Sequence, residues 1–459
     1  MTYDLTAPPD PNLAPGEARC PGPSTRDIIL KDGDNPPAAI VTEQPAYLGD
    51  EDMALSRYTD PANYDAEMER MWNRTWQWAC REEHIPNPGD YYVYDVGHNS
   101  VIVLRHTDQS IRAFVNSCPH RGMQFADAAT QGQGKQFLRC PFHGMSWHLD
   151  GSVREIPCRW DFPHVQDETF GLTKVRTGTW GGFVFINLDP NAAPLKDYLE
   201  VLPEHFKETP LEERFVAVHL EKMLPGNWKM CMEAFLEAYH VLATHPEGLH
   251  TTADANAQYD VFGNNVTRFV HTFGYPSPHL PKKLSEEELF AALGHDPADL
   301  PAGTGARQRH ADLLRQSLSR EWGADLSGVS NSIMLDSIEY HLFPNACFFP
   351  GINIRLIYRF RPAGYDRTIH DVLLLQPVPE NKPRPKPAEV IRLGIDDSYT
   401  TVDSFVATGL AALLDQDTEN FKRQWAGMQA SLRGTQTLGN YQESRIRAFH
   451  RTLDQYLEG

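Results

Sequence analysis

The sequence predicts an α+β protein in which a small all-β domain precedes a larger domain of strands and long helices. Two observations indicate this class. Between residues 75 and 188, short alternating or apolar segments are separated by Gly, Asp and Asn turns, as in β-strands. After residue 189, apolar strand-like segments are interspersed with amphipathic stretches long enough to form helices.

The composition is that of a globular protein with a sizeable core, with 459 residues, 41% hydrophobic and 22% charged. A formal net charge of -19 argues against a nucleic-acid or anionic-membrane partner. No secretory leader and no run of about 18 apolar residues is visible, so we expect no membrane span. The seven scattered cysteines form no disulfide framework, which predicts a reducing, cytoplasmic location.

The N-terminal part is expected to form an arm and a first helix that pack with the larger domain. Residues 1 to about 48 are rich in Pro, Gly and Asp, which predicts an extended arm, either disordered or lying against another surface. Residues 64–80 are predicted to form an amphipathic helix. Four large apolar residues recur there at helical spacing: Met68, Met71, Trp72 and Trp76.

The larger domain is predicted to alternate between helices and strands. Helices are expected at residues 197–208, 227–245 and 399–432, the last closing the chain. The polar stretch 275–330 indicates an inserted excursion with helical pieces. Strands are expected at residues 214–224, 337–351, 352–362 and 368–379.

The first motif is a Cys-x-His pair followed, after nineteen residues, by Cys-x-x-His: Cys118, His120, Cys140 and His143. Two cysteines and two histidines suit tetrahedral zinc or an iron–sulfur cluster. Each half carries one Cys and one His on a tight loop between strands, whereas zinc fingers place a His pair on a helix. Two facing loops fit a [2Fe–2S] cluster with thiolates on one iron and imidazoles on the other. A zinc site with the same ligands is the alternative.

The segments "CPHRG" and "CPFHGMSW" resemble the cluster-binding motifs of the Rieske family. The resemblance implies that Cys118 and Cys140 hold one iron and that His120 and His143 hold the other. Replacing thiolates by neutral imidazoles raises the reduction potential.

The second motif lies in the predicted helix 227–245. A cluster moves electrons but does no bond chemistry, so a second site or a partner is needed; two histidines and one carboxylate form such a site in non-haem iron oxygenases. His240 and His245 are about 140° apart on a straight helix, so we expect the helix to widen or end near His245, before Pro246. Glu237 can accept the second imidazole N–H of His240. Glu233 is either a solvated helix charge or a functional group.

The third ligand should be a distant carboxylate, with Asp415, Asp417 and Glu419 as candidates. The segments "NWK", "FLEAYH" and "QDTENF" resemble the catalytic α-subunit of Rieske non-haem iron oxygenases of the ring-hydroxylating dioxygenase type, over the chain from about residue 57 onward. The resemblance implies that His240, His245 and Asp417 hold a mononuclear Fe(II), with Asp415 as runner-up. It also implies a helix-grip catalytic domain, in which an antiparallel sheet curves round a long helix. The implied domains are 1–74, 75–188 (Rieske) and 189–459 (catalytic).

The sequence departs from this family at Glu237, where most members have Asp. That residue is understood to bridge the mononuclear site to a cluster histidine of the neighbouring subunit in a ring-shaped trimer. The resemblance implies that Glu237 links His240 to His143 of the next subunit. Glu at this position resembles oxygenases of quaternary amines, while the length and the 275–330 excursion are closer to ring-hydroxylating members.

The resemblance implies a terminal oxygenase that uses O2 to hydroxylate or dihydroxylate a small organic substrate, aromatic or polycyclic, as in aromatic hydrocarbon catabolism. No Gly-x-Gly-x-x-Gly follows a strand, so NAD(P)H would act only through a separate reductase, with or without a ferredoxin. We expect a homotrimer, with or without a β subunit. The alternatives are an N- or O-demethylating or quaternary-amine monooxygenase and a Rieske electron carrier. Phe235, His250 and Phe348 are either pocket or core residues.

Overall fold

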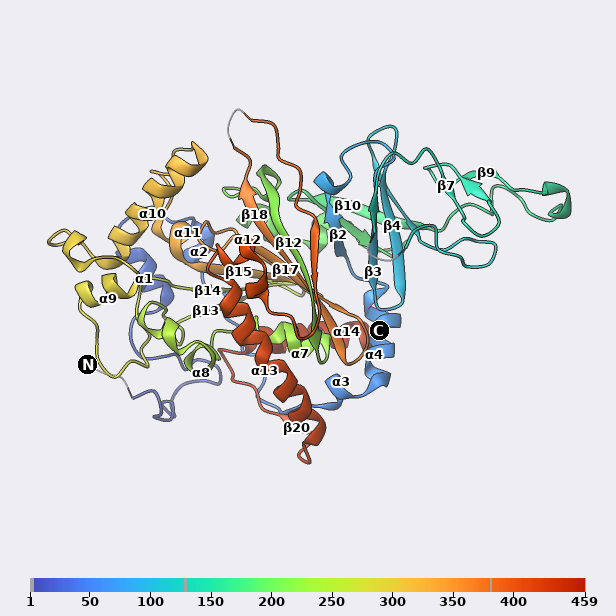
Figure 1. Ribbon diagram of the computed structural model, residues 1–459. Helices are drawn as coiled ribbons and strands as arrows, with labels where there is room; N and C mark the ends of the chain where they lie inside the picture. The colour runs from blue at the N-terminus through green and yellow to red at the C-terminus, as the bar shows by residue number, and fades with distance from the viewer. Residues whose placement is uncertain (1–3, 128–129, 380–381, 459) are drawn as a thin grey trace. The chain divides into compact units, whose positions relative to one another are not determined.

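The computed structural model describes residues 4–127, 130–379 and 382–458. The chain forms two compact units (Figure 1). The smaller unit is Asp65–Tyr198, and the larger combines the segment up to Tyr64 with the chain from Leu199 onward. This division lies ten residues outside the predicted 75–188 at each end.

The smaller unit is a β-domain with two antiparallel sheets. A seven-stranded sheet has the order β2-β11-β10-β5-β4-β3-β6, and a three-stranded sheet has the order β7-β8-β9. Trp147 and Leu138 lie at the centre of its core. The strands are β2 (Gln77–Arg81), β3 (Tyr91–Val96), β4 (Asn99–Arg105), β5 (Ile111–Val115), β6 (Gln131–Gly132), β7 (Leu138–Arg139), β8 (Ser146–Trp147), β9 (Val153–Glu155), β10 (Lys174–Trp180) and β11 (Phe183–Asn187).

The predicted helix over 64–80 is wrong in its second half. Helix α4 (Pro61–Glu67) continues into a π-helical turn at Met68–Trp72, but Gln77–Arg81 forms strand β2 and pairs with β11. Every residue of β2 is buried, so pairing within the sheet outweighs the helical spacing of the apolar residues.

The larger unit contains an eight-stranded sheet of order β13-β14-β15-β16-β17-β18-β12-β19. All pairs are antiparallel except β12 with β19. β12 and β18 pair along their whole length, from Arg214 opposite Pro377 to Pro225 opposite Arg367. The strands are β12 (Arg214–Pro225), β13 (Gln258–Val261), β14 (Val266–His271), β15 (Ser337–Leu342), β16 (Ala346–Phe348), β17 (Leu356–Pro362), β18 (Arg367–Pro377) and β19 (Val390–Leu393). A separate pair joins β1 (Met53–Ala54) to β20 (Thr435–Gln436).

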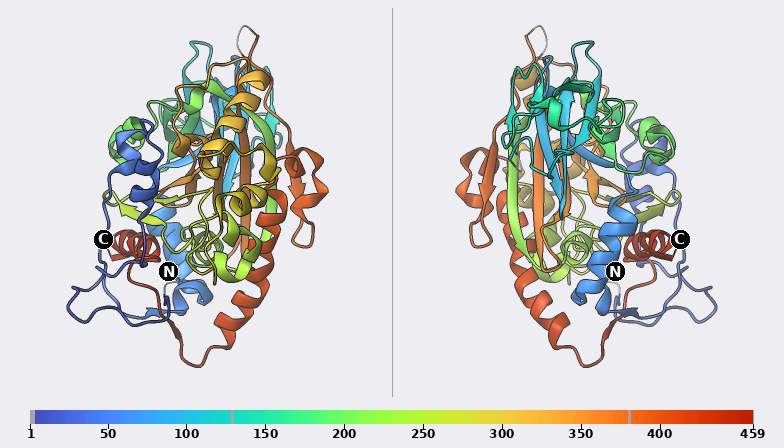
Figure 2. Two further views of the ribbon diagram at one scale, coloured as in Figure 1. Left: turned by 90° about the vertical axis from the view of Figure 1, so that its left-hand side faces the viewer. Right: turned by 90° about the vertical axis from the view of Figure 1, so that its right-hand side faces the viewer.

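Helices cover one face of this curved sheet, which confirms the predicted helix-grip arrangement. Helix α7 (Trp228–Glu233) packs against β17 and β18, and α13 (Ala411–Ala430) packs against β12 and α7 (Figure 1). Figure 2 shows α13, in orange-red, running beside the edge of the sheet. Among the described residues, no helix combines the length and apolar character needed to cross a membrane.

Two helix predictions in this unit need correction. The predicted helix 227–245 is interrupted after α7 by an irregular segment, and only Val241–Thr244 (α8) is helical again. The predicted helix 399–432 contains α12 (Asp403–Val406) and α13 but does not close the chain. Helix α14 (Ser444–Glu458), which buries Ile446, Phe449 and Leu453, is not among the predicted helices.

The N-terminal arm lies against the larger unit and is partly helical, unlike the extended arm predicted. Ser24 caps helix α1 (Thr25–Lys31) through a capping box, and the hydroxyl of Thr25 donates to the carbonyl of Asn256. The excursion contains helices, as predicted. The remaining helices are α2 (Ala38–Val41), α3 (Ser56–Thr59), α5 (Leu195–Tyr198), α6 (Leu202–His205), α9 (Glu286–Ala292), α10 (Ala306–Trp322) and α11 (Asn331–Leu335).

Two candidate metal centres

The two Cys/His loops of the smaller unit are built alike. In the loop after β5, the amide of Cys118 donates to the carbonyl of Met123, and its carbonyl accepts from Gly122. In the loop between β7 and β8, Cys140 makes the same two bonds with Met145 and Gly144. Gly122 and Gly144 have φ values of 76° and 77°, the left-handed region that favours glycine. The repeated geometry places the two cysteines at equivalent positions, whereas His120 follows its cysteine by two residues and His143 by three.

The four predicted ligands face one another. The rings of His120 and His143 lie 4.6 Å apart between centroids. Cys118 and Cys140 are each 2% exposed, and their thiols are close enough to hydrogen-bond yet form no disulfide. Burial raises the pKa of the Cys118 thiol, and the neighbouring Cys140 adds to this effect. Buried Nδ1 of His120 has no partner among the described residues. Two neighbouring thiols and two neighbouring imidazoles are the donor set that a [2Fe–2S] Rieske cluster requires.

Large apolar side chains are exposed beside these loops. Met123 is 43% exposed and Phe142 55%, and the Phe142 ring lies 3.8 Å from that of His143. Trp160, two residues before a phenylalanine that contacts His120, is 79% exposed. His143 itself is exposed. The histidine side of this centre therefore lies at an apolar surface of the unit.

In the larger unit, His240, His245 and Asp417 converge. One ligand atom from each lies within 4.8 Å of the others. Oδ1 of Asp417 is 2.7 Å from Nε2 of His245 and 3.4 Å from Nε2 of His240. The interrupted helix makes this possible: His240 precedes α8, and His245 ends it with φ -126° and ψ 55°. Two imidazoles and one carboxylate fit a non-haem Fe(II).

Each of these histidines is oriented through its second ring nitrogen. Nδ1 of His240 lies 2.7 Å from Oε1 of Glu237, whose other oxygen accepts from the His240 amide at 2.9 Å. Nδ1 of His245 lies 2.7 Å from Oε1 of Gln416, and Gln416 donates to Glu247 at 2.8 Å. Such contacts fix the ring and leave Nε2 free for a metal. Neither Gln416 nor Glu247 is among the residues predicted from the sequence; the position of Gln416, directly before Asp417, is the one signal available.

The other acidic candidates do not face this site. Asp415 accepts from the amide of Tyr399 at 3.0 Å and from the hydroxyl of Ser398, so it holds the preceding turn. Glu419 is exposed. Glu233 is buried and accepts hydrogen bonds from Tyr58 and His450. These hydrogen bonds join helices α3, α7 and α14. The solvated-charge interpretation of Glu233 is therefore wrong, and its role here is structural.

The three candidate ligands shift one another's pKa values. Burial opposes a charge on His240, but Asp417 and Glu237 raise the pKa of His240 to about 10. Burial likewise opposes the ionised form of Asp417, yet the two histidines lower its pKa. A cation at this position would replace the proton that these carboxylates attract, as metal binding to deprotonated ligands requires.

A cavity of about 390 Å³ lies beside these three residues. Its wall is mainly apolar and includes Phe235, Phe269, Phe349 and Leu413. Of the pocket candidates named from the sequence, Phe235 lines the cavity, whereas His250 and Phe348 are not among the described residues that line it. None of the described residues lining it is Lys or Arg.

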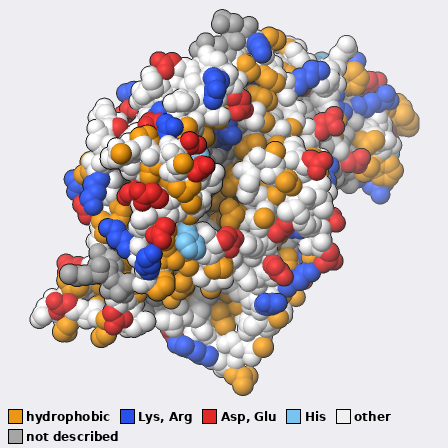
Figure 3. All heavy atoms as spheres, turned by 60° about the vertical axis from the view of Figure 1, so that its left-hand side comes forward, with side chains coloured by type: hydrophobic (Ala, Val, Ile, Leu, Met, Phe, Trp, Pro, Cys, Tyr) orange, Lys and Arg blue, Asp and Glu red, His pale blue; other side chains and the backbone are white. Residues whose placement is uncertain are grey.

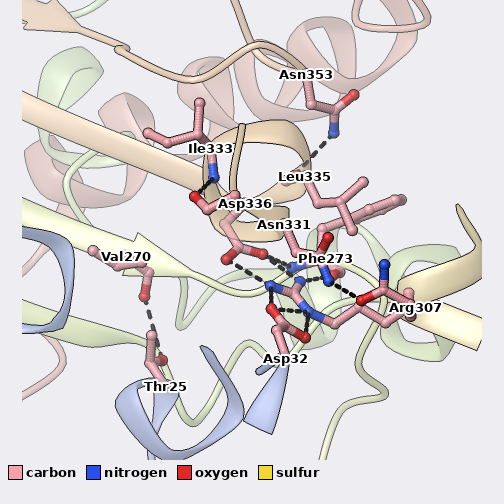
Figure 4. Close-up of polar contacts among 12 residues, drawn as sticks. Thr25, Asp32, Val270, Phe273, Arg307, Asn331, Ile333, Leu335, Asp336 and Asn353 are labelled. Carbon is pink, nitrogen blue, oxygen red and sulfur yellow. Dashed lines mark hydrogen bonds and ion pairs between the residues drawn. The ribbon is translucent and has the colours of Figure 1, made fainter. Parts of the chain in front are cut away.

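A buried ion-pair network supports one wall of this cavity (Figure 4). Arg307 of helix α10 lies between Asp32, from the arm, and Asp336, with nitrogen–oxygen distances of 2.8 and 2.6 Å. The backbone of Phe273, which lines the cavity, donates to Asp336 at 3.0 Å and accepts from Arg307. The arm and the excursion therefore both hold the end of β14 in place.

Comparisons with known proteins agree with this architecture. Residues 204–459 match the family described as ring hydroxylating alpha subunit (catalytic domain), and residues 75–166 match the Rieske [2Fe-2S] domain. The carnitine monooxygenase oxygenase subunit of Escherichia coli (strain K12) is 30% identical over 238 residues, 51% of this chain and 62% of that protein. Benzene 1,2-dioxygenase subunit alpha of Pseudomonas putida is 33% identical over 327 residues, 67% of this chain and 66% of that protein. The chain thus spans slightly less than two thirds of each relative's length.

The fold is shared with solved structures. The quaternary ammonium Rieske monooxygenase CntA with L-carnitine has a TM-score of 0.63 and 17% identity, over 90% of this chain and 96% of that chain. The fold and the two ligand sets define a protein that combines a Rieske domain with a mononuclear-iron catalytic domain. The chain belongs to the ring-hydroxylating alpha-subunit family. Its two matched domains imply a [2Fe–2S] cluster and a mononuclear iron as cofactors.

Proposed function

We propose that this chain is the terminal oxygenase component of a Rieske non-haem iron system that hydroxylates or dihydroxylates a neutral aromatic or polycyclic substrate with O2. The observation that carries the proposal is the apolar cavity that reaches His240, His245 and Asp417. Family membership supports the oxygenase class, and the cavity supports the kind of substrate.

We assign the cluster to Cys118, His120, Cys140 and His143, and the mononuclear iron to His240, His245 and Asp417. When bound, the cluster would supply single electrons and the iron would activate O2. The side chains of Glu237 and Gln416 keep the two imidazoles with Nε2 toward the metal position. The apolar wall binds the substrate and excludes water beside the three ligands.

The substrate is proposed to be uncharged because, apart from the side chains assigned to the metal, the described lining of the cavity offers no basic side chain to a substrate anion. The described lining contains no Lys or Arg, and burial, with His240 and His245 nearby, lowers the pKa of His271 to about 4. His271 is therefore neutral near pH 7. Glu339, also in the lining, is already paired with Arg445 at 2.8 Å. An aromatic hydrocarbon would need none of these charges.

A quaternary-amine or demethylating monooxygenase is the second candidate. Glu237 in place of Asp favours it, as does similarity to the Escherichia coli carnitine monooxygenase subunit. The faces of Phe235 and Tyr358 in the cavity would attract a quaternary ammonium group. The carboxylate of carnitine, however, would find no Lys or Arg in the described lining, so we place this function second.

We also propose the assembly and partners. The chain would form a homotrimer in which Glu237 links His240 to His143 of the next subunit, and a β subunit would be an optional addition. Exposed His143 and its apolar surroundings support an encounter with another protein surface at that side. Electrons would come from NAD(P)H through a separate reductase, with or without a ferredoxin. We propose a cytoplasmic location from the scattered cysteine pattern.

The test is O2 consumption coupled to NADH oxidation with a surrogate reductase and ferredoxin, comparing naphthalene and biphenyl with L-carnitine. The proposal expects O2 uptake matched by a hydroxylated product with an aromatic hydrocarbon only. His240→Ala should abolish that product. Product formation from L-carnitine alone would replace our proposal by the second candidate.

A further inference from the structure

A second cavity, whose lining does not include the candidate iron ligands, contains a guanidinium group that makes no hydrogen bond or ion pair with any described residue. The molecular surface is hollowed on the face shown in Figure 3, where hydrophobic side chains lie among charged ones. Within the larger unit, one cavity of about 660 Å³ is lined by the end of α10, helix α11, the loop before β17 and the end of β18. This volume is in the range of small-molecule sites.

Arg355 is the unusual residue of this cavity. Its Nε and Nη1 are buried but make no hydrogen bond or ion pair with any described residue. The two other arginines of the lining are engaged: Arg214 donates to the carbonyl of Pro350 at 2.8 Å, and Arg384 donates to that of Arg214 at 2.8 Å. Burial lowers the pKa of Arg355, and only Glu321 opposes this effect. A buried hydrogen-bond donor without an acceptor destabilises a protein. We therefore expect a ligand to supply the acceptor that the Arg355 guanidinium lacks.

The residues around Arg355 indicate the shape and polarity of such a ligand. The guanidinium carbon lies 5.0 Å from the ring centroid of Trp322, which leaves the edge of the guanidinium free. Three buried apolar side chains complete the wall: Leu326, Ile333 and Ile352. A flat apolar body packed on this wall, with one acidic group at Arg355, would satisfy both features.

The charge of the site favours a carboxylate over a phosphate. One guanidinium fork pairs with a single carboxylate through two parallel hydrogen bonds. The exposed rim carries Glu208, Glu212 and Glu213, which would repel a dianion more strongly than a monoanion. We propose that this cavity binds a small organic carboxylate with a planar apolar body, held by Arg355 beside Trp322.

The cavity shares structural elements with the proposed iron-site cavity. Ile352 and Arg355 line the carboxylate cavity, whereas Asn353 and Ile354, from the same loop, line the other. Helix α11 likewise contributes Ile333 to the first and Leu335 to the second. The proposal rests on this cavity alone and does not depend on the proposed oxygenase function.

The test is titration calorimetry of benzoate and its neutral analogue benzamide with the full-length protein carrying its metals. We expect benzoate to bind, benzamide to bind at least about tenfold more weakly, and Arg355→Gln to weaken benzoate by at least about tenfold. Arg320→Gln, an exposed arginine of the same helix as Trp322, should leave benzoate binding unchanged. No benzoate binding, or binding that Arg355→Gln leaves unchanged, would overturn the proposal.

A stability measurement separates loss of a site from loss of the fold. Because Arg355 makes no hydrogen bond or ion pair with a described residue, the ligand-free Arg355→Gln protein should lose only the contact with the Trp322 ring and should unfold within about 2 °C of the wild type. Benzoate should raise the midpoint of the wild type but not of the variant. A midpoint of the ligand-free variant that is lower by well over about 2 °C would show that Arg355 has a further structural partner and would contradict the proposed site.

Discussion

Nδ1 of His245 lies 2.7 Å from Oε1 of Gln416, the residue directly before Asp417 on helix α13. Two successive residues of one helix thus act on the same imidazole from its two nitrogens, because Asp417 lies 2.7 Å from Nε2. We therefore expect Gln416→Leu to weaken iron retention about tenfold or more. Iron content after dialysis against a chelator measures this.

Asn420, one turn further along α13, provides the matched control. It is exposed, and its side-chain amide donates to the hydroxyl of Thr244 at 3.2 Å and to the backbone carbonyl of Gln416 at 3.4 Å, without a hydrogen bond to His245. Asn420→Leu should keep its mononuclear iron. Equal iron loss in both variants would mean that Gln416 acts through helix stability and not through His245.

Glu237 has a contact with His240 that can be tested separately from metal binding. Glu237→Ala should weaken iron retention as Gln416→Leu does and, in addition, should slow turnover per bound iron about tenfold to a hundredfold. Glu237→Asp keeps the carboxylate and should lose less. Turnover with EPR spectra of both centres makes the comparison; unchanged turnover in Glu237→Ala would exclude the bridging role.

The pair between Arg307 and Asp32 joins the arm to the cavity wall. Asp32→Asn should destabilise the larger unit by about 1–3 kcal/mol, since a buried charged hydrogen-bond partner is weakened. Because Phe273 is held by the same network, the KM for the substrate should rise more than kcat falls. Chemical denaturation and steady-state kinetics give both values. As a control, Lys31→Gln changes an exposed residue at the end of helix α1, directly before Asp32. It should change neither the unfolding free energy nor the KM.

Glu443 makes the stability depend on pH. Burial, assisted by Glu237 and Glu233, raises the pKa of Glu443 to about 7 from 4.5. The folded state then binds more protons than the unfolded state between pH 4.5 and 7, so the free energy of unfolding falls as the pH rises through that window. Partial exposure limits the effect to on the order of 2 kcal/mol. Glu443→Gln should flatten the profile of unfolding free energy against pH; an unchanged slope would contradict this origin.

The sequence predicts the candidate metal ligands more accurately than it predicts the bounds of the helices. Cys118, His120, Cys140 and His143 lie on loops whose Pro and Gly residues are visible in the sequence, and the structure brings them together. The sequence predicts a helix break only near His245, whereas the structure has a break directly after α7. Apolar spacing does not reveal this earlier break, because it does not show that the His240 amide donates to Glu237. Tertiary contacts decide such breaks.

Other features left no signal in the chemistry of single residues. Gln416 is a neutral amide without ligand spacing, and the unpartnered Arg355 is an ordinary arginine until its surroundings are known. Strand β2 has apolar residues at helical spacing but is buried in a sheet. Helix α14, by contrast, is predictable from the sequence, since Ile446, Phe449 and Leu453 have helical spacing.

The central claim is that the chain holds a two-iron cluster and a separate iron at His240, His245 and Asp417. The direct measurement is iron, zinc and acid-labile sulfide per chain in the wild type and in Asp417→Ala. We expect about three irons and about two sulfides in the wild type, and about two of each in Asp417→Ala. Zinc in place of iron, or an iron content that Asp417→Ala leaves unchanged, would contradict the account.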